Sequence, residues 1–206
     1  MELDSREVAI APQLAALRER TVYVGLLRES PAQDTELGFR TALTEPFVAV
    51  LPASHPLAAQ RTVRVDQLAD CPFVLLPRAV GPSLCDRITG LCADAGFTSR
   101  VARHAVEWQT VCALMETGLG VSPAPASIRR IRLKGVAFRG ITPATARTRV
   151  AVAWRESDTN PLIPGILAAL RHEPPTGPAG PAPRWGGRPE STEPPLKCPR
   201  RVEVPG

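Results

Sequence analysis

An α/β fold, with helices covering a buried parallel sheet, is the architecture expected of this chain. Two observations support it. Phe47–Leu51 is an unbroken apolar run closed by Pro52, which is typical of a strand buried on both faces. A strand, a short helix and a second strand are expected within Leu3–Leu27, and such a βαβ unit requires parallel pairing.

The N-terminal elements follow from short patterns. Pro12 suits a first helical turn, and Leu14 and Leu17 fall on one helical face. In chain order we expect a weak strand, a helix, a buried strand, a polar connection and the long apolar strand: Leu3–Ala9, Pro12–Arg20, Val22–Leu27, Arg28–Arg40 and Ala42–Pro52.

A well-delimited helix is expected after Gly81 and Pro82. Ser83 and Asp86 have the spacing of a capping box, and Gly96 is placed to end the helix. Its apolar face consists of residues at helical spacing: Leu84, Ile88, Leu91, Cys92 and Ala95.

Further elements alternate strands and helices towards the C-terminus. Asn160 is expected to cap the last helix, with Pro161 in its first turn and Leu162, Ile166, Leu167 and Leu170 on its inner face. The other helical elements are a turn that Leu68 starts after Asp66 and a helix from Glu107 to Gly118, with Val111, Leu114 and Met115 on its inner face. The other strands are Phe73–Leu76, Val101–Val106, a strand that begins at Gly120, Val136–Ile141 and Arg149–Trp154.

Composition argues against several classes of protein. Of the 206 residues, 44% are hydrophobic and 22% charged, which is enough for one large or two small cores. The net charge of +5 is dispersed, and the single basic cluster, Arg129–Lys134, is interpreted as a solvated surface in preference to a nucleic-acid contact. The odd number of cysteines, five, without a CxxC pair favours neither disulfides nor zinc, so no metal or cofactor is expected.

The two ends of the chain carry their own predictions. Met1–Arg20 is charged throughout and no apolar run has membrane-spanning length, so we expect a cytoplasmic protein without a membrane partner. Residues 173–206 are rich in proline and poor in large apolar side chains, and we expect this tail to be disordered.

Several spaced motifs occur together. EPFVAVLPASHPLA begins at Glu45, VDQLADCPFVLLPR begins at Val65, and DAGF, ETG-LGV and PAS follow, the last ending at Ser127. In this order the motifs resemble the effector-binding domain of LysR-type transcriptional regulators, over about Glu2–Arg171. Gly81-Pro82 after the PFVLLPR strand resembles the branch that responds to aromatic acids. The resemblance implies a transcription-regulating domain that senses a small organic acid.

It also implies an architecture of two Rossmann-like subdomains, as in type 2 periplasmic-binding proteins, with the ligand in the cleft between them. Subdomain one would comprise residues 2–41 and 126–171, and subdomain two residues 43–125, with crossings near Phe39–Thr44 and Pro123–Ser127. The family carries a helix-turn-helix domain and a further strand and helix ahead of the segment that aligns with Glu2. We therefore expect a truncated first subdomain, no DNA-binding domain and no direct nucleic-acid contact.

Candidate ligand-binding residues follow two expected strands of the second subdomain. Ligands of α/β sheets bind beyond the carboxyl ends of strands, where helix N-termini present N–H groups to anions. A carboxylate effector would meet Pro77, Arg78, Gly81, Pro82 and Ser83 at one helix start, and Glu107, Gln109 and Thr110 at the other. The resemblance adds Arg28, with a hypothetical Arg28–Glu107 pair across the cleft. For each of three residues a role without ligand contact stays open: Ser83 and Thr110 as helix caps, and Arg78 as an exposed arginine at the rim of the cleft.

Other functions stay open beside ligand sensing. Cys85 with His104 or His55 would supply the nucleophile and base of a thiol enzyme, but Cys85 lies on an apolar helix face and we expect no enzyme. A solute-binding receptor is disfavoured by the charged N-terminus. The chain is alternatively an interaction partner that forms homodimers or joins full-length regulators.

Overall fold

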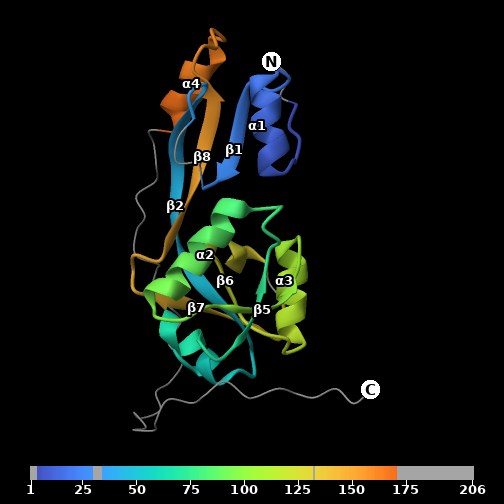
Figure 1. Ribbon diagram of the computed structural model, residues 1–206, viewed down its shortest axis with the longest axis vertical. Helices are drawn as coiled ribbons and strands as arrows, with labels where there is room; N and C mark the ends of the chain where they lie inside the picture. Colours follow the sequence, from blue (N-terminus) through green and yellow to red (C-terminus); the bar gives the residue numbers. More distant parts are fainter. Residues whose placement is uncertain (1–3, 30–33, 132, 171–206) are drawn as a thin grey trace.

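Two bodies lie one above the other along the long axis of the computed structural model (Figure 1). The upper body contains α1 (Ile10–Arg18), β1 (Val24–Arg28) and α4 (Leu162–Ala169), and the lower body contains the remaining helices. One strand, β2 (Leu37–Pro52), extends through both. The structure describes residues 4–29, 34–131 and 133–170.

The main sheet is organised around β2. Its first half pairs antiparallel with β8 (Arg147–Arg155), and its second half pairs antiparallel with β6 (Ser122–Pro125) and β7 (Val136–Thr142). The strand order is β1-β8-β2-β7-β3, where β3 is Thr62–Arg64 and β6 joins β2 off this path. Because β8 and β7 pair with successive halves of one long strand, the two bodies share a continuous hydrogen-bonded backbone.

The upper body has a small core on one face of its sheet. Leu17 of α1 is fully buried against Leu27 and Ala153. The close approach of α1 depends on Gly25, where a Cβ atom would lie 2.9 Å from Gln13 Oε1. On the other side, Arg40 Nη1 donates to the carbonyl of Leu167 at 2.9 Å and so ties α4 to β2.

In the lower body, α2 (Pro82–Asp94) and α3 (Trp108–Glu116) cover opposite sides of the second half of β2. Phe47, Ala49 and Leu51 enter the core on the α2 side, and Val48 and Val50 enter the core on the α3 side. The expected burial of this segment on both faces is confirmed, since every residue from Phe47 to Pro52 is buried.

A second, two-stranded sheet completes the lower body. β4 (Pro72–Leu75) and β5 (Arg100–His104) pair in parallel, and Val121 bridges to Phe73 in parallel just before β6. Pro123 is tolerated in β6 because this strand pairs with β2 on one side. Three short 3₁₀ turns connect the strands: η1 (Pro56–Ala59), η2 (Val65–Leu68) and η3 (Ala126–Arg130).

The prediction of a parallel main sheet is wrong. Every pair in it is antiparallel except β3 with β7, because the chain returns to β2 through β7 and β8. The described part of the expected strand Leu3–Ala9 has no regular structure, so β1 belongs to no βαβ unit within the described residues. Four consecutive polar residues, 4–7, give that segment no apolar face to bury.

Three details of the helices also differ from expectation. Gly81 is the N-cap of α2 and Asp86 pairs with Arg78, so Ser83 and Asp86 form no capping box. In α4, Ile163 is the buried residue and Leu162 and Ile166 are exposed. The inward face of the helix is therefore the one that carries Ile163. Pro161, and not Asn160 as expected, is the N-cap of α4, although the Asn160 side chain accepts from Leu162 N at 3.0 Å.

The expected subdomain boundaries, 2–41 with 126–171 and 43–125, stay a prediction. Strand pairing favours moving the second boundary: β7 pairs with Val48–Pro52, so it lies with the lower body, and β8 begins the return to the upper body. The tail 173–206 lies outside the described residues. Among the residues that the structure describes, no helix is long and apolar enough to span a membrane.

Phe47→Ala is expected to lower the free energy of unfolding by about 3–5 kcal/mol, because it removes a ring with no exposed surface and leaves a cavity beside β2. Urea denaturation measures the change. Leu119→Ala, at a side chain 43% exposed, should cost less than about 1 kcal/mol. Equal losses for both variants would contradict the central packing role of Phe47.

Candidate functional site

The two expected ligand-binding segments meet at one edge of the lower body. Because β4 and β5 are parallel, their carboxyl ends lie at the same edge. β4 leads into the segment from Pro77 to Ser83, and β5 leads into Glu107–Thr110. This edge faces the upper body, where β1 ends (Figure 1). We call it the carboxyl edge.

Neither helix that starts at the carboxyl edge is capped by a side chain. Gly81, the N-cap of α2, has no side chain, and the Glu107 carboxylate makes no capping bond to α3. The first-turn N–H groups of a helix have no partner within the helix. Gln109 and Thr110 are exposed, while Trp108 packs against both cores and holds the start of α3. The edge therefore presents two uncapped helix starts.

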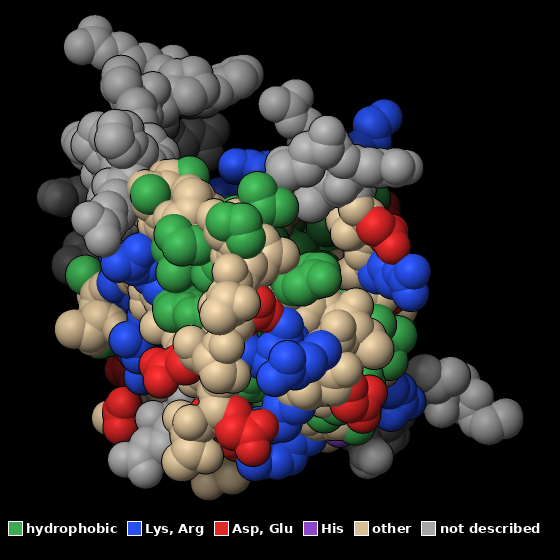
Figure 2. Space-filling model, turned by 90° about the horizontal axis from the view of Figure 1, so that it is seen from above, with side chains coloured by type: hydrophobic (Ala, Val, Ile, Leu, Met, Phe, Trp, Pro, Cys, Tyr) green, Lys and Arg blue, Asp and Glu red, His purple; other side chains and the backbone are tan. Residues whose placement is uncertain are grey.

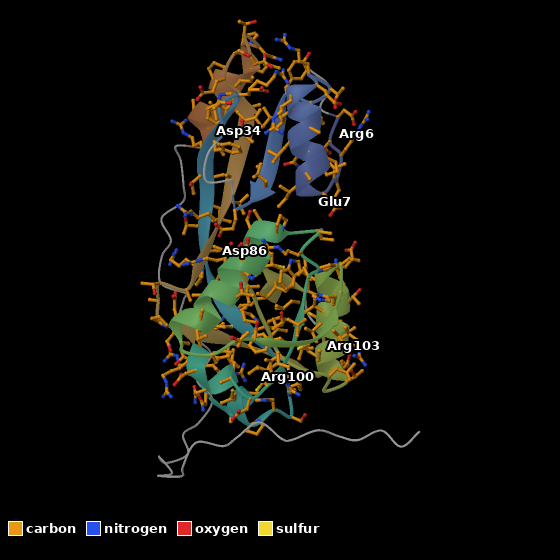
Figure 3. The ribbon with its side chains drawn as sticks, in the orientation of Figure 1. Arg6, Glu7, Asp34, Asp86, Arg100 and Arg103 are labelled. Carbon is orange, nitrogen blue, oxygen red and sulfur yellow. The ribbon has the colours of Figure 1, made fainter. Side chains whose placement is uncertain are left out.

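Arg78 is bound to a neighbouring carboxylate. Its guanidinium forms two hydrogen bonds with Asp86 on α2, one of them 3.0 Å long (Asp86 is labelled in Figure 3). The side chains are 67% and 53% exposed, and pairs this exposed contribute little to stability. Arg78 is therefore held next to the helix start by an interaction that an incoming anion can replace at small cost.

Arg28 binds Glu45, and the hypothetical Arg28–Glu107 pair is not formed. Arg28 Nη1 donates to Glu45 Oε1 at 2.8 Å. The Glu45 carboxylate, 6% exposed as a residue, also accepts from Ser127 N at 2.6 Å and from Ser127 Oγ at 3.1 Å. Glu107 stays exposed at the head of α3. Arg28 therefore connects the end of β1 to β2 and, through Glu45, to η3.

Two further contacts lie beside this cluster. Thr148 stands opposite Glu45 in the β2–β8 register, fully buried, and its hydroxyl has no hydrogen-bond partner among the described residues. Arg87 of α2 donates from Nε to the carbonyl of Arg147 and from Nη2 to that of Thr145, both at 3.1 Å. These bonds fix α2 to the start of β8.

Sequence reasoning did not find Glu45, Ser127, Thr148 or Arg87. A signal existed for Glu45, because a lone carboxylate stands two positions before the apolar run. Burial beside that run requires a partner. The partners themselves are distant in sequence, with Ser127 82 positions from Glu45.

The structure does not place His55 or the exposed His104 as the partner of Cys85, so the thiol–imidazole pair of the enzyme interpretation is not assembled. His55 Nε2 lies 3.7 Å from Cys71 Sγ, and its Nδ1 accepts from Leu57 N at 3.2 Å. Cys85 Sγ donates to the carbonyl of Leu76 at 3.1 Å. Burial raises the pKa of the Cys85 thiol, although the nearby Arg78 opposes this. Burial also lowers the pKa of His55.

Metal binding has no support in the described part of the chain. No group of three or more His, Cys, Asp or Glu side chains there is arranged to hold an ion. The chemistry that the carboxyl edge offers is hydrogen bonding to an anion.

Comparison with known proteins identifies related chains. Residues 2–174 match the family model of the LysR substrate binding domain. The HTH-type transcriptional regulator IlvR of Caulobacter vibrioides is 31% identical over 176 residues, which cover 84% of this chain and 58% of IlvR. The HTH-type transcriptional regulator AlsR of Bacillus subtilis is 28% identical over 163 residues, 79% of this chain and 54% of AlsR. The chain thus spans somewhat more than half the length of these relatives.

Solved structures show the same fold. Full-length CbnR complexed with its target DNA superimposes with a TM-score of 0.73 at 24% identity, covering 80% of this chain and 57% of CbnR. The BenM effector-binding domain with its effector benzoate gives a TM-score of 0.72 at 23% identity, covering 81% of this chain and 76% of that one.

A double-mutant cycle of Arg28→Gln and Glu45→Gln should give a coupling energy of about 1–3 kcal/mol in urea denaturation, because the Glu45 carboxylate is buried and bound on two sides. The matched cycle, Arg64→Gln with Asp66→Asn, tests an exposed pair and should give at most about 1 kcal/mol. Equal coupling in both cycles would refute the structural role of the buried pair.

The described cysteines should resist alkylation in the native protein. Burial raises the pKa of Cys92 to about 11 and raises those of Cys85 and Cys112, so the thiolate fraction is small at pH 8 and increases as pH rises. In a Cys198→Ser variant, iodoacetamide labelling followed by mass spectrometry should be at least ~100-fold slower than for free cysteine. Rapid modification of Cys85 at pH 7 would restore the enzyme interpretation.

Proposed function

The chain belongs to the LysR substrate binding domain family, and on this premise we propose that it senses a small organic acid at the carboxyl edge. The supporting observation is the convergence of two uncapped helix starts on an edge that faces the upper body. Its relatives are transcriptional regulators, so the role is a regulatory one, exercised in the cytoplasm where bacterial DNA lies.

The chemistry of the edge favours a carboxylate. Helix N-termini attract anions through free N–H groups and through the helix dipole. At α2 these groups follow Pro82, and Ser83 adds a half-buried hydroxyl. Arg78 supplies a guanidinium, whose planar donors match a carboxylate. At α3, Gln109 and Thr110 provide exposed polar side chains on the opposite flank.

Competition between the ligand and Asp86 would set the affinity. Asp86 occupies the Arg78 donors in the absence of an effector. An acid that binds at the head of α2 offers Arg78 a second carboxylate, and both pairings are exposed enough to exchange. The aromatic class of acid rests on the resemblance of Gly81-Pro82, after the PFVLLPR strand, to the branch of the family that responds to aromatic acids.

The junction residues have a separate part in the proposal. Arg28, Glu45 and Ser127 join the two bodies, and Arg87 fixes α2 to the start of β8. A ligand that shifts α2 therefore acts directly on the strand that returns to the upper body. Catalysis has no place in this proposal, because neither Cys85 nor the junction carboxylate is arranged to act on a bound acid.

Protein association is a second candidate function. β1 is an edge strand of the main sheet, and the side chains of Leu26 in it and of Tyr23 just before it are 63% and 55% exposed. Figure 2 shows hydrophobic side chains gathered at the upper end of the molecule, where α4 also exposes Leu162 and Ile166. Such a surface suits a homodimer or a full-length regulator as partner.

Ligand binding is tested by a thermal-shift screen of the full chain with aromatic and aliphatic carboxylates, each beside its neutral amide. We expect at least one acid to raise the melting temperature while its amide does not. In calorimetric titration, Arg78→Gln should lower the affinity for that acid about tenfold, and Asp86→Asn should raise the affinity. Arg100→Gln, at the opposite end of β5 (Figure 3), is the control and should change nothing.

No melting shift with any acid, from a chain with a cooperative unfolding transition, would refute the proposal. An equal loss of affinity in Arg78→Gln and Arg100→Gln would locate the binding elsewhere.

A further inference from the structure

A pocket of about 510 Å³ opens in the lower body between η3 and β7. It is lined by Ala53, Arg129, Val136, Ala137, Phe138 and Arg139. It shares no residue with the carboxyl edge, so whatever it binds is independent of the function proposed above. The pocket is shallow and open to solvent, so a small molecule bound there would keep one face exposed.

The pocket follows an unpaired stretch of β7. This strand pairs with β2 on one side, but on its other side β3 reaches only residues 140–142. The preceding residues 136–139 have no strand partner there among the described residues. Arg139 Nη1 donates to the Phe138 carbonyl at 3.0 Å and so covers an acceptor that an added strand would need. The pocket therefore favours a small ligand over an extended peptide.

Arg139 is held in place as an anion donor. Its Nε donates to the carbonyl of Ala58 at 2.8 Å, in addition to the Nη1 bond to Phe138. A guanidinium has five N–H donors, so three remain for a ligand after these two bonds. A group fixed by backbone acceptors loses little conformational freedom on binding.

A second guanidinium lies across the pocket. Arg129 is exposed at the end of η3, and no carboxylate of the described residues pairs with it. Glu116 is the acidic neighbour: its Cγ lies 2.7 Å from where a Cβ on Gly135 would stand, next to the Val136 end of the pocket. With two arginines and one glutamate at its periphery, the pocket has a positive net charge, which suits a ligand with a single negative charge.

The remaining lining is apolar. Val136 and Phe138 are half-buried and pack against the core on the α3 side. The phosphates of a nucleic acid need no such apolar floor, and they would use the exposed Arg130 and Lys134 equally well. We propose that this pocket binds an amphipathic monocarboxylate, whose carboxylate meets Arg129 and Arg139 and whose apolar body lies on Val136 and Phe138.

Benzoate, benzamide and inorganic phosphate are suitable probes, titrated into the ¹⁵N-labelled full chain and followed by amide chemical shifts. Benzoate should produce saturable shifts at Ala53 and Val136–Arg139, and benzamide should not. Arg129→Gln should weaken binding there about tenfold. Arg130→Gln, an exposed neighbour that does not line the pocket, is the matched control and should have no effect. Arg78→Gln should leave these shifts unchanged, which separates this pocket from the carboxyl edge.

Four results would overturn the proposal: no saturable shifts at these amides, equal shifts with benzamide, displacement of benzoate by phosphate at similar concentration, or equal losses in Arg129→Gln and Arg130→Gln. Because Arg129 is exposed, its variant keeps the fold, and the dispersion of the amide spectrum verifies this. Arg139→Lys is a second variant, which keeps the charge and loses the fixed geometry. This variant should lower the affinity for benzoate, but benzoate should still shift the amide signals of the residues that line the pocket.

Discussion

The sixteen-residue strand β2 is the constraint on which the rest of the structure depends. Its first half is paired with β8 in the upper body, and its second half, buried on both faces, divides the two cores of the lower body. A single strand of this length makes the two bodies adjacent without any linker. Every other strand of the main sheet is placed by pairing with β2 directly or through β7 and β8.

The middle of β2 carries a buried charge, and this makes the junction between the bodies specific. Glu45 is bound by Arg28 from β1 and by Ser127 from η3, so the carboxylate is satisfied only when both bodies are in position. Losing one partner leaves a buried charge unsatisfied, which is costly. Apolar packing alone would tolerate sliding or rotation at this point; the directional hydrogen bonds do not.

The binding surfaces derive from this framework in different ways. The carboxyl edge exists because β4 and β5 are parallel, so two helices begin side by side. The pocket beside η3 exists because β3 is too short to cover β7 along its whole length. The buried cysteines serve packing in both lower cores. The basic residues near Arg129, which looked like an undifferentiated solvated surface, include one that lines this pocket.

Local patterns were sufficient for the buried segment of β2, for the inner faces of α2 and α3, and for the family. The run from Phe47, the apolar face of α2 and the helix ends at Gly96 and Gly118 depend on neighbouring residues, and all are found as expected. Strand direction, the inward face of α4 and the partner of Arg28 were not predictable in this way. They depend on which distant segments the chain path brings together: Ser127 lies 82 positions from Glu45, and Thr145 lies 58 positions from Arg87. Hydrophobic periodicity indicates which face of a helix or strand is buried. Which residue packs against that face depends on the tertiary structure, because the partner comes from a distant part of the chain.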